Sequence, residues 1–178
     1  MSNALYLLAS LPMLKLGDQP PLSIEELRYS CTGVMSEQEL SAFDALVAGD
    51  DHEDPFVASY YAHETQLKNV AGRLRAAAWG PDVRFSERSF VGFDVTFAKM
   101  VSDAFAKTDP LEREMDLDKA RFWLVDELAG TCEDTIAAVY AFTVKLMICC
   151  RWNRLSEEAG NAIVLQVIND NDPAFRQE

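Results

Sequence analysis

One stretch of the sequence decides the fold: residues 55–79 read PFVASYYAHETQLKNVAGRLRAAAW. Its apolar residues recur at alternating intervals of four and three, which places them along one side of an α-helix. Such a face is stable only when it is covered, so the segment predicts one long helix buried against other helices. The stripe consists of Phe56, Tyr60, His63, Leu67, Val70, Leu74 and Ala77.

Capping signals mark where helices begin. A serine followed three residues later by a glutamate occurs twice and forms a capping box, in which each side chain accepts a free backbone amide. At two further places, Asp54-Pro55 and Asp109-Pro110, an aspartate directly precedes a proline, which is tolerated at the first helical position because its missing N–H is not needed there. We expect helices to start at these four places and at two further ones. The six starts are Ser23, Ser36, Asp54, Asp109, Thr131 and Ser156.

Two later segments have the same helical spacing and predict two more buried faces. The first includes one charged member, Asp118, and the second includes one polar member, Thr143. Because the other members are apolar, we interpret both stripes as core faces. The stripes are Leu111, Met115, Asp118, Phe122, Val125 and Ala129, and Ile136, Tyr140, Thr143, Met147 and Cys150.

These patterns predict an all-α fold, a bundle of about six helices. Strand signals are sparse and are confined to residues 83–91, between two glycines, where we expect an irregular connector over residues 80–92. We expect a single domain of residues 1–178, with a subdivision into 1–80 and 93–178 as the alternative.

The charge balance limits the classes of partner. The 178 residues include 16 basic and 29 acidic side chains, a net charge of −13, which repels phosphate backbones and anionic lipids. We therefore expect no nucleic-acid partner and no membrane insertion. The longest apolar stretch, residues 136–150, contains Lys145 and is too short to cross about 30 Å of hydrocarbon. The acidity favours a basic protein surface as partner, or serves solubility alone.

The cysteines and the N-terminal residues indicate a cytoplasmic protein. The four cysteines have no CxxC spacing, which is typical of buried thiols in a reducing compartment. Residues 5–11 are apolar but lack a basic flank and a cleavage pattern, so we interpret them as part of the folded protein. The cysteines are Cys31, Cys132, Cys149 and Cys150.

Catalytic and cofactor motifs are weak throughout. The glycines are scattered, so they form neither a GxGxxG motif nor a phosphate-binding loop. His63 and Glu64 resemble the start of the zinc motif HExxH, but Leu67 stands where the second histidine belongs. His52 lies in an acidic run that we interpret as a solvated linker. We therefore expect no catalytic, metal or cofactor site, and a structural place for His63 on the core stripe.

Asp118 and Arg121 predict a buried ion pair. Asp118 falls on an apolar stripe, and Arg121 is one turn away on the same helix, where it is a natural partner. We expect His63, Asp118 and Arg121 to be polar residues of the core, and loss of Asp118 to destabilise the fold. The catalytic alternative is a small hydrolase that uses His63 with Glu64 or Asp118.

Arg151, Trp152 and Arg154 are candidates for a partner interface. Tryptophan and arginine are enriched among the residues that dominate binding energy at protein interfaces. The alternative is that Trp152 closes the core while the arginines lie at the C-terminus of a helix, where positive charge is stabilising.

Four short motifs occur in order along the chain: YLLASLPML at residues 6–14, PPLSIEEL at 20–27, PLE at 110–112 followed by DKARFW at 118–123, and RW at 151–152 followed by Leu155 and Gly160. In this order they resemble a bacterial family usually encoded among V-type (A-type) ATPase genes. The resemblance implies that the family takes the place of the socket subunit of the rotary ATPase, which is named C in bacteria and d in eukaryotes.

The resemblance implies a non-catalytic, all-helical coupling component without catalytic residues. Such a component is cytoplasmic and peripheral, and it connects the central stalk with the membrane c-ring. Socket proteins of this kind are roughly twice as long and have three helical lobes, so this chain would supply a reduced socket or regulate assembly. A free-standing acidic adaptor is the main alternative, and the small hydrolase is the second.

Overall fold

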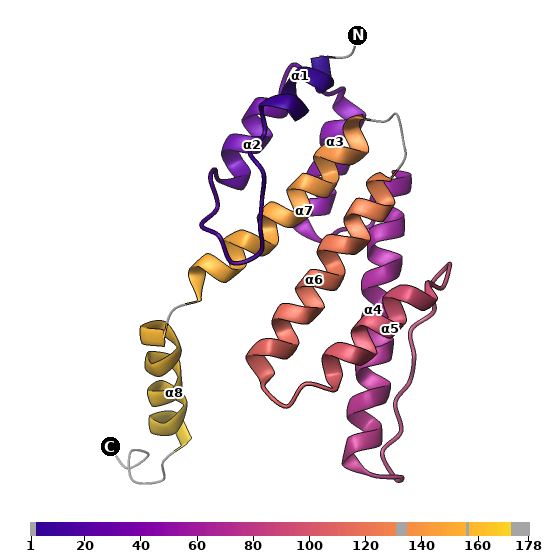
Figure 1. Ribbon diagram of the computed structural model, residues 1–178, viewed down its shortest axis with the longest axis vertical. Coiled ribbons are helices and arrows are strands. Elements are labelled where there is room, and N and C mark those ends of the chain that lie inside the picture. Colours follow the sequence, from indigo (N-terminus) through magenta and orange to yellow (C-terminus); the bar gives the residue numbers. More distant parts are fainter. Residues whose placement is uncertain (1–2, 131–134, 156, 172–178) are drawn as a thin grey trace.

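The computed structural model describes residues 3–130, 135–155 and 157–171, and the structural statements below concern those residues. Within them it contains eight α-helices and no strand, so the predicted all-α class is confirmed. Figure 1 shows α1 to α3 beside α7, and α4, α5 and α6 side by side. The helices are α1 (Asn3–Ser10), α2 (Ile24–Cys31), α3 (Glu37–Ala48), α4 (Pro55–Trp79), α5 (Val95–Phe105), α6 (Pro110–Ala129), α7 (Thr135–Arg154) and α8 (Glu157–Asn171).

Four predicted helix starts are confirmed by the cap geometry. Both capping boxes form, with the serine oxygen accepting the third amide of the helix and the glutamate accepting the serine amide. The carboxylates of Asp54 and Asp109 each accept an amide of a helix that begins with proline. The predicted starts at Thr131 and Ser156 lie outside the described residues.

The prediction of about six helices was too low, because it missed α1 and α5. Helix α5 begins after Asp94, whose carboxylate accepts a hydrogen bond from the amide of Phe97 at 2.8 Å. Asp94 has neither the following proline nor the glutamate at the third helical position that marked the other starts. A single capping carboxylate is a weak signal unless the apolar face that follows it is also recognised.

Two hydrophobic cores hold helices α1 to α7 together. The first surrounds α7 and includes side chains of α1, α2 and α3, with Tyr140 and Phe43 fully buried. The second lies between α4, α5 and α6, and Phe97 is fully buried there. Helices α4 and α6 contribute to both cores, so each core combines residues from both sides of the connector. None of the described helices has the length and apolar character needed to cross a lipid bilayer.

The predicted stripes are confirmed in part. On α4, Phe56, Leu67 and Val70 are buried, whereas Ala77 is exposed. On α6 the predicted stripe begins too early, because Leu111 is exposed. The prediction also missed a second apolar face of α6. The helix needs two apolar faces because it lies between the two cores. The missed face consists of Leu117, Ala120 and Leu124.

The connector, which spans residues 80–94 in the structure and not the predicted 80–92, runs along α4 and is held there by two buried carboxamides. The side chain of Gln66 donates to the carbonyl oxygen of Asp94 at 2.6 Å and accepts from its amide at 3.0 Å. The side chain of Asn69 makes the same pair of bonds with Arg88, at 2.8 and 3.0 Å. Each carboxamide thus satisfies the backbone of one connector residue, as a neighbouring β-strand would.

Gly72 continues this line of contact with the connector. The ring of Phe85 lies so close that a Cβ added at Gly72 would be 2.3 Å from its Cε2 and Cζ atoms. The glycine therefore has a packing role that offsets its low helix propensity. The connector is ordered by α4 although it has no regular secondary structure.

We predict that Gly72→Ala has opposite effects in two backgrounds. In the natural chain the new methyl group meets the Phe85 ring and should lower the free energy of unfolding by about 1–3 kcal/mol. In a Phe85→Ala background the same change should raise it by about 0.5–1 kcal/mol, because alanine favours the helix. Urea unfolding of the four proteins measures both effects. Equal effects in the two backgrounds would contradict the close packing of Phe85 on α4.

Candidate functional site

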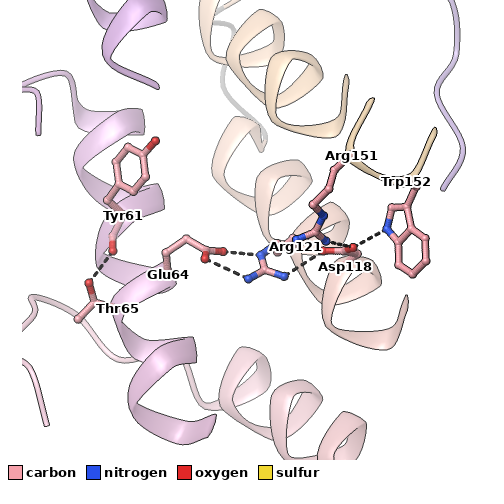
Figure 2. A network of polar contacts seen from close by, with 7 residues as sticks. All are labelled: Tyr61, Glu64, Thr65, Asp118, Arg121, Arg151 and Trp152. Atoms are coloured by element: carbon pink, nitrogen blue, oxygen red, sulfur yellow. Dashed lines mark hydrogen bonds and ion pairs between the residues drawn. The ribbon is translucent and has the colours of Figure 1, made fainter. Parts of the chain in front are cut away.

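Asp118 is the centre of a buried network of charged side chains (Figure 2). Its side chain is fully buried between α6 and α7. One carboxylate oxygen accepts from Nη1 of Arg121 at 2.9 Å, and the other accepts from the indole Nε1 of Trp152 at 2.6 Å. The second oxygen also accepts from Nη2 of Arg151. A buried carboxylate is stable only when such donors replace water.

Arg121 extends the network from Asp118 to α4. Its Nε and Nη2 donate to the two carboxylate oxygens of Glu64 at 2.7 and 3.1 Å, a bidentate pair. Both side chains are largely buried, so solvent screens the pair only weakly. Burial lowers the pKa of Arg121, but the hydrogen bond to Glu64 and the charges of Glu64 and Asp118 raise it by more. The guanidinium therefore stays charged and joins α4 to α6.

The network is balanced in charge. Glu64 and Asp118 contribute two negative charges, and Arg121 and Arg151 contribute two positive charges. Tyr60 lies beside it, and burial followed by the charge of Glu64 raises the pKa of this phenol, which stays protonated. Among the described residues, every charged group of the network has a partner of opposite charge. The network therefore offers no unpaired charge to a reaction.

The structure places His63 outside the network. Its Nδ1 donates to the carbonyl oxygen of Ser59 at 2.8 Å, and its ring lies edge-on to Phe97 with the centroids 5.8 Å apart. Among the described residues, neither Glu64 nor Asp118 forms a hydrogen bond or an ion pair with His63. The three residues of the hydrolase hypothesis are therefore not arranged as a base with its partner, which general acid–base chemistry requires.

The three residues of the predicted partner interface have different environments. Trp152 is half-buried against the first core and turns its N–H inward to Asp118. Arg151 reaches the same carboxylate, although about half of its side chain, 49%, is exposed. Arg154 is exposed. Their role as an interface remains a prediction, and Trp152 and Arg151 also have an internal role.

A cavity of about 230 Å³ lies directly beside the network, between α4, α6 and α7. Charged side chains of the network form part of its wall, and apolar side chains of α7 form most of the rest. Within the described residues no group of histidine, cysteine and carboxylate side chains is arranged to hold a metal ion. The cavity is lined by Tyr60, Glu64, Arg121, Val144, Met147, Ile148 and Arg151.

Sequence reasoning missed Glu64, Arg151 and Trp152 as members of the network. Glu64 was considered only in the zinc motif and in the hydrolase alternative, although it lies four residues after Tyr60 of the core stripe. That position on one helix face was a signal that its carboxylate points towards the core. Trp152 carried no such signal, because its contact with Asp118 spans 34 positions of the chain.

Comparisons with known proteins provide no family for this chain. No protein-family model, no curated protein and no solved structure matches it. The resemblance to proteins encoded with V/A-type ATPases therefore stays a prediction that depends on the short motifs quoted above. A function must therefore be inferred from the contacts and the exposed surfaces of this chain.

We predict that Asp118→Asn destabilises the protein by about 3 kcal/mol. The change removes the negative charge that compensates Arg151. It also removes one of the two negative charges beside Arg121, which then has Glu64 as its remaining partner. The matched control is Asp126→Asn on the same helix, because Asp126 is 62% exposed and pairs with Lys145. It should cost less than about 1 kcal/mol. Thermal and urea unfolding compare the two, and an equally mild effect of both would show that the network is not an anchor.

Proposed function

We propose that this protein is a non-catalytic, protein-binding component of a larger assembly and contacts its partner through α8. The observation that carries the proposal is the exposure of apolar side chains on this helix. Figure 1 shows α8 apart from the other helices, and every side chain described in it, over residues 160–169, is exposed. Five large aliphatic side chains are between 54% and 61% exposed: Ile163, Val164, Leu165, Val167 and Ile168.

The spacing on α8 is that of a helix that binds in a groove. Gly160, Ile163, Val164, Val167 and Ile168 follow one another at positions i, i+3, i+4, i+7 and i+8, which forms a single stripe. Nothing lies within 4 Å of a Cβ added at Gly160, so a partner has room to approach closely there. An exposed stripe of this kind is typical of an interaction site.

The buried charged residues support a non-catalytic role. Glu64, Asp118, Arg121 and Arg151 neutralise one another and connect three helices. Their hydrogen bonds are used for internal structure, so they supply neither a free base nor an unpaired nucleophile. The remaining feature available for recognition is the surface.

The partner that we propose is the central stalk and c-ring of a V/A-type ATPase, on the basis of the motif resemblance. A cytoplasmic, peripheral location belongs to the same proposal. In this arrangement the apolar stripe of α8 would be buried in a groove of a neighbouring protein of the complex. A short, single-lobed chain would serve as a reduced socket or as an assembly factor.

A free-standing acidic adaptor is a second candidate, favoured by the net charge of −13. Its affinity for a basic partner should fall steeply as salt is added, because exposed charges are screened over about 8 Å at physiological ionic strength. Binding through the apolar stripe of α8 should change little over the same range of salt.

We predict that Ile163→Glu weakens binding to the purified V/A-type ATPase from the source cells by about 10-fold to 100-fold. Loss of one buried aliphatic side chain costs about 1.5–3 kcal/mol, and each 1.4 kcal/mol is tenfold in affinity. The control is Leu165→Glu, which makes the same change at a similarly exposed position off the stripe. It should alter the dissociation constant by less than about threefold. Surface plasmon resonance with the full-length chains measures both.

The outcomes separate the partner from the binding element. Both variants should keep the melting temperature of the natural chain, because both side chains are exposed. Equal weakening by the two substitutions would contradict the stripe as the contact surface. An ATPase that is complete without this chain and does not bind it would contradict the proposed partner.

A further inference from the structure

A second pocket, of about 460 Å³, lies where the end of α4 meets α5 and the start of α6. It is separate from the ionic network and from α8. Apolar and aromatic side chains form most of its wall, together with two arginines and a serine, and none of its lining residues is acidic. Its volume is in the range that small-molecule ligands occupy. The lining residues are Leu74, Arg75, Ala78, Trp79, Ser102, Phe105, Ala106 and Arg113.

The two arginines of this pocket make cation–π contacts with one aromatic ring. The guanidinium carbons of Arg75 and Arg113 lie over the ring of Phe105, 5.4 and 5.1 Å from its centroid. A guanidinium held by an aromatic ring through a cation–π contact can still donate its N–H groups to a hydrogen-bond acceptor. Phe105 therefore fixes the positions of both cations and leaves donors for a third group.

Those donors are largely unused within the described residues. Neither Arg75 nor Arg113 forms an ion pair there, whereas Arg73 pairs with Glu87 and Lys107 with Glu112. Nη2 of Arg113 donates to the carbonyl oxygen of Lys107 at 2.9 Å. Its Nε is buried and has no hydrogen-bond partner among the described residues. The guanidinium of Arg75, which is exposed, and Nη1 of Arg113 form no hydrogen bond within the described residues, so they are the donors available to an acceptor from outside the chain.

The rest of the pocket suits an aromatic group. The indole of Trp79 is 79% exposed at the rim, which is unusual for so large an apolar side chain. Leu74, Ala78 and Phe105 provide further apolar surface beside it. A ring placed there would replace water on apolar atoms while its charged substituent meets the guanidinium groups.

We infer that this pocket binds an aromatic oxyanion, a ligand with a carboxylate or phosphate group attached to an aromatic ring. Arg75 and Arg113 recognise the oxyanion, for which arginine offers paired donors. The indole of Trp79 contacts the ring. This binding is independent of the proposed role of α8, because the pocket and that helix share no residue.

The test titrates the full-length protein with phenyl phosphate and phenylacetate. Calorimetry measures the dissociation constant, and tryptophan fluorescence reports contact with Trp79, with Trp79→Phe assigning the signal. Inorganic phosphate and 2-phenylethanol are the controls, since the first lacks the ring and the second lacks the charge. The tighter of the two aromatic oxyanions identifies the source as a phosphate or a carboxylate, and either result supports the site.

The variants are Arg75→Gln and Arg113→Gln, with Arg84→Gln as the matched control. Arg84 is exposed and outside the pocket lining, so its substitution removes the same charge without touching the site. We expect each pocket substitution to weaken binding about tenfold or more, and Arg84→Gln to change it by less than about threefold. Arg75→Gln is the cleaner variant, because Arg75 makes no hydrogen bond that supports the described fold.

Three results would overturn the inference. The first is the absence of saturable binding of either aromatic oxyanion with a dissociation constant below about 1 mM. The second is equal binding of inorganic phosphate or of 2-phenylethanol, which would remove the need for the ring or for the charge. The third is equal weakening by Arg84→Gln and by Arg75→Gln, which would mean a diffuse effect of charge.

Discussion

The bidentate ion pair between Arg121 and Glu64 is the constraint on which the arrangement of the helices depends. The guanidinium of Arg121 and the carboxylates of Glu64 and Asp118 are largely buried, so their charges are stable only when they are paired. This pairing fixes the distance between α4 and α6 and their rotation relative to each other. Asp118 then extends the constraint to α7 through Arg151 and Trp152. Apolar packing alone would tolerate small shifts of these helices, whereas the hydrogen-bond geometry does not.

This constraint also fixes the C-terminal turn of α7. Because Trp152 is turned inward to Asp118, the last turn of α7 is fixed to the body of the protein. Helix α8 lies apart from the other helices, and its apolar stripe begins only a few positions further along the sequence. The contacts that neutralise Asp118 thus hold the end of α7, and α8 begins only three positions after it.

Helix α4 serves three neighbours at once. One face packs Leu67 and Val70 into the second core, and Glu64 enters the ionic network. A further face carries the two carboxamides and the glycine that hold the connector. These contacts explain why four polar or small residues of an amphipathic helix pack against other parts of the protein: Glu64, Gln66, Asn69 and Gly72.

The sequence by itself determined the all-α class, four helix starts and the pairing of Asp118 with Arg121, because each depends on residues within a few positions of one another. Spacing and capping act within one or two turns, so they can be recognised from neighbouring residues. Tertiary structure alone decided that Glu64, 57 positions before Arg121, completes the network, and that α6 needs two apolar faces. It also decided that Gln66 and Asn69 bind the connector. These contacts depend on which distant segments meet, and the packing of the whole chain selects them.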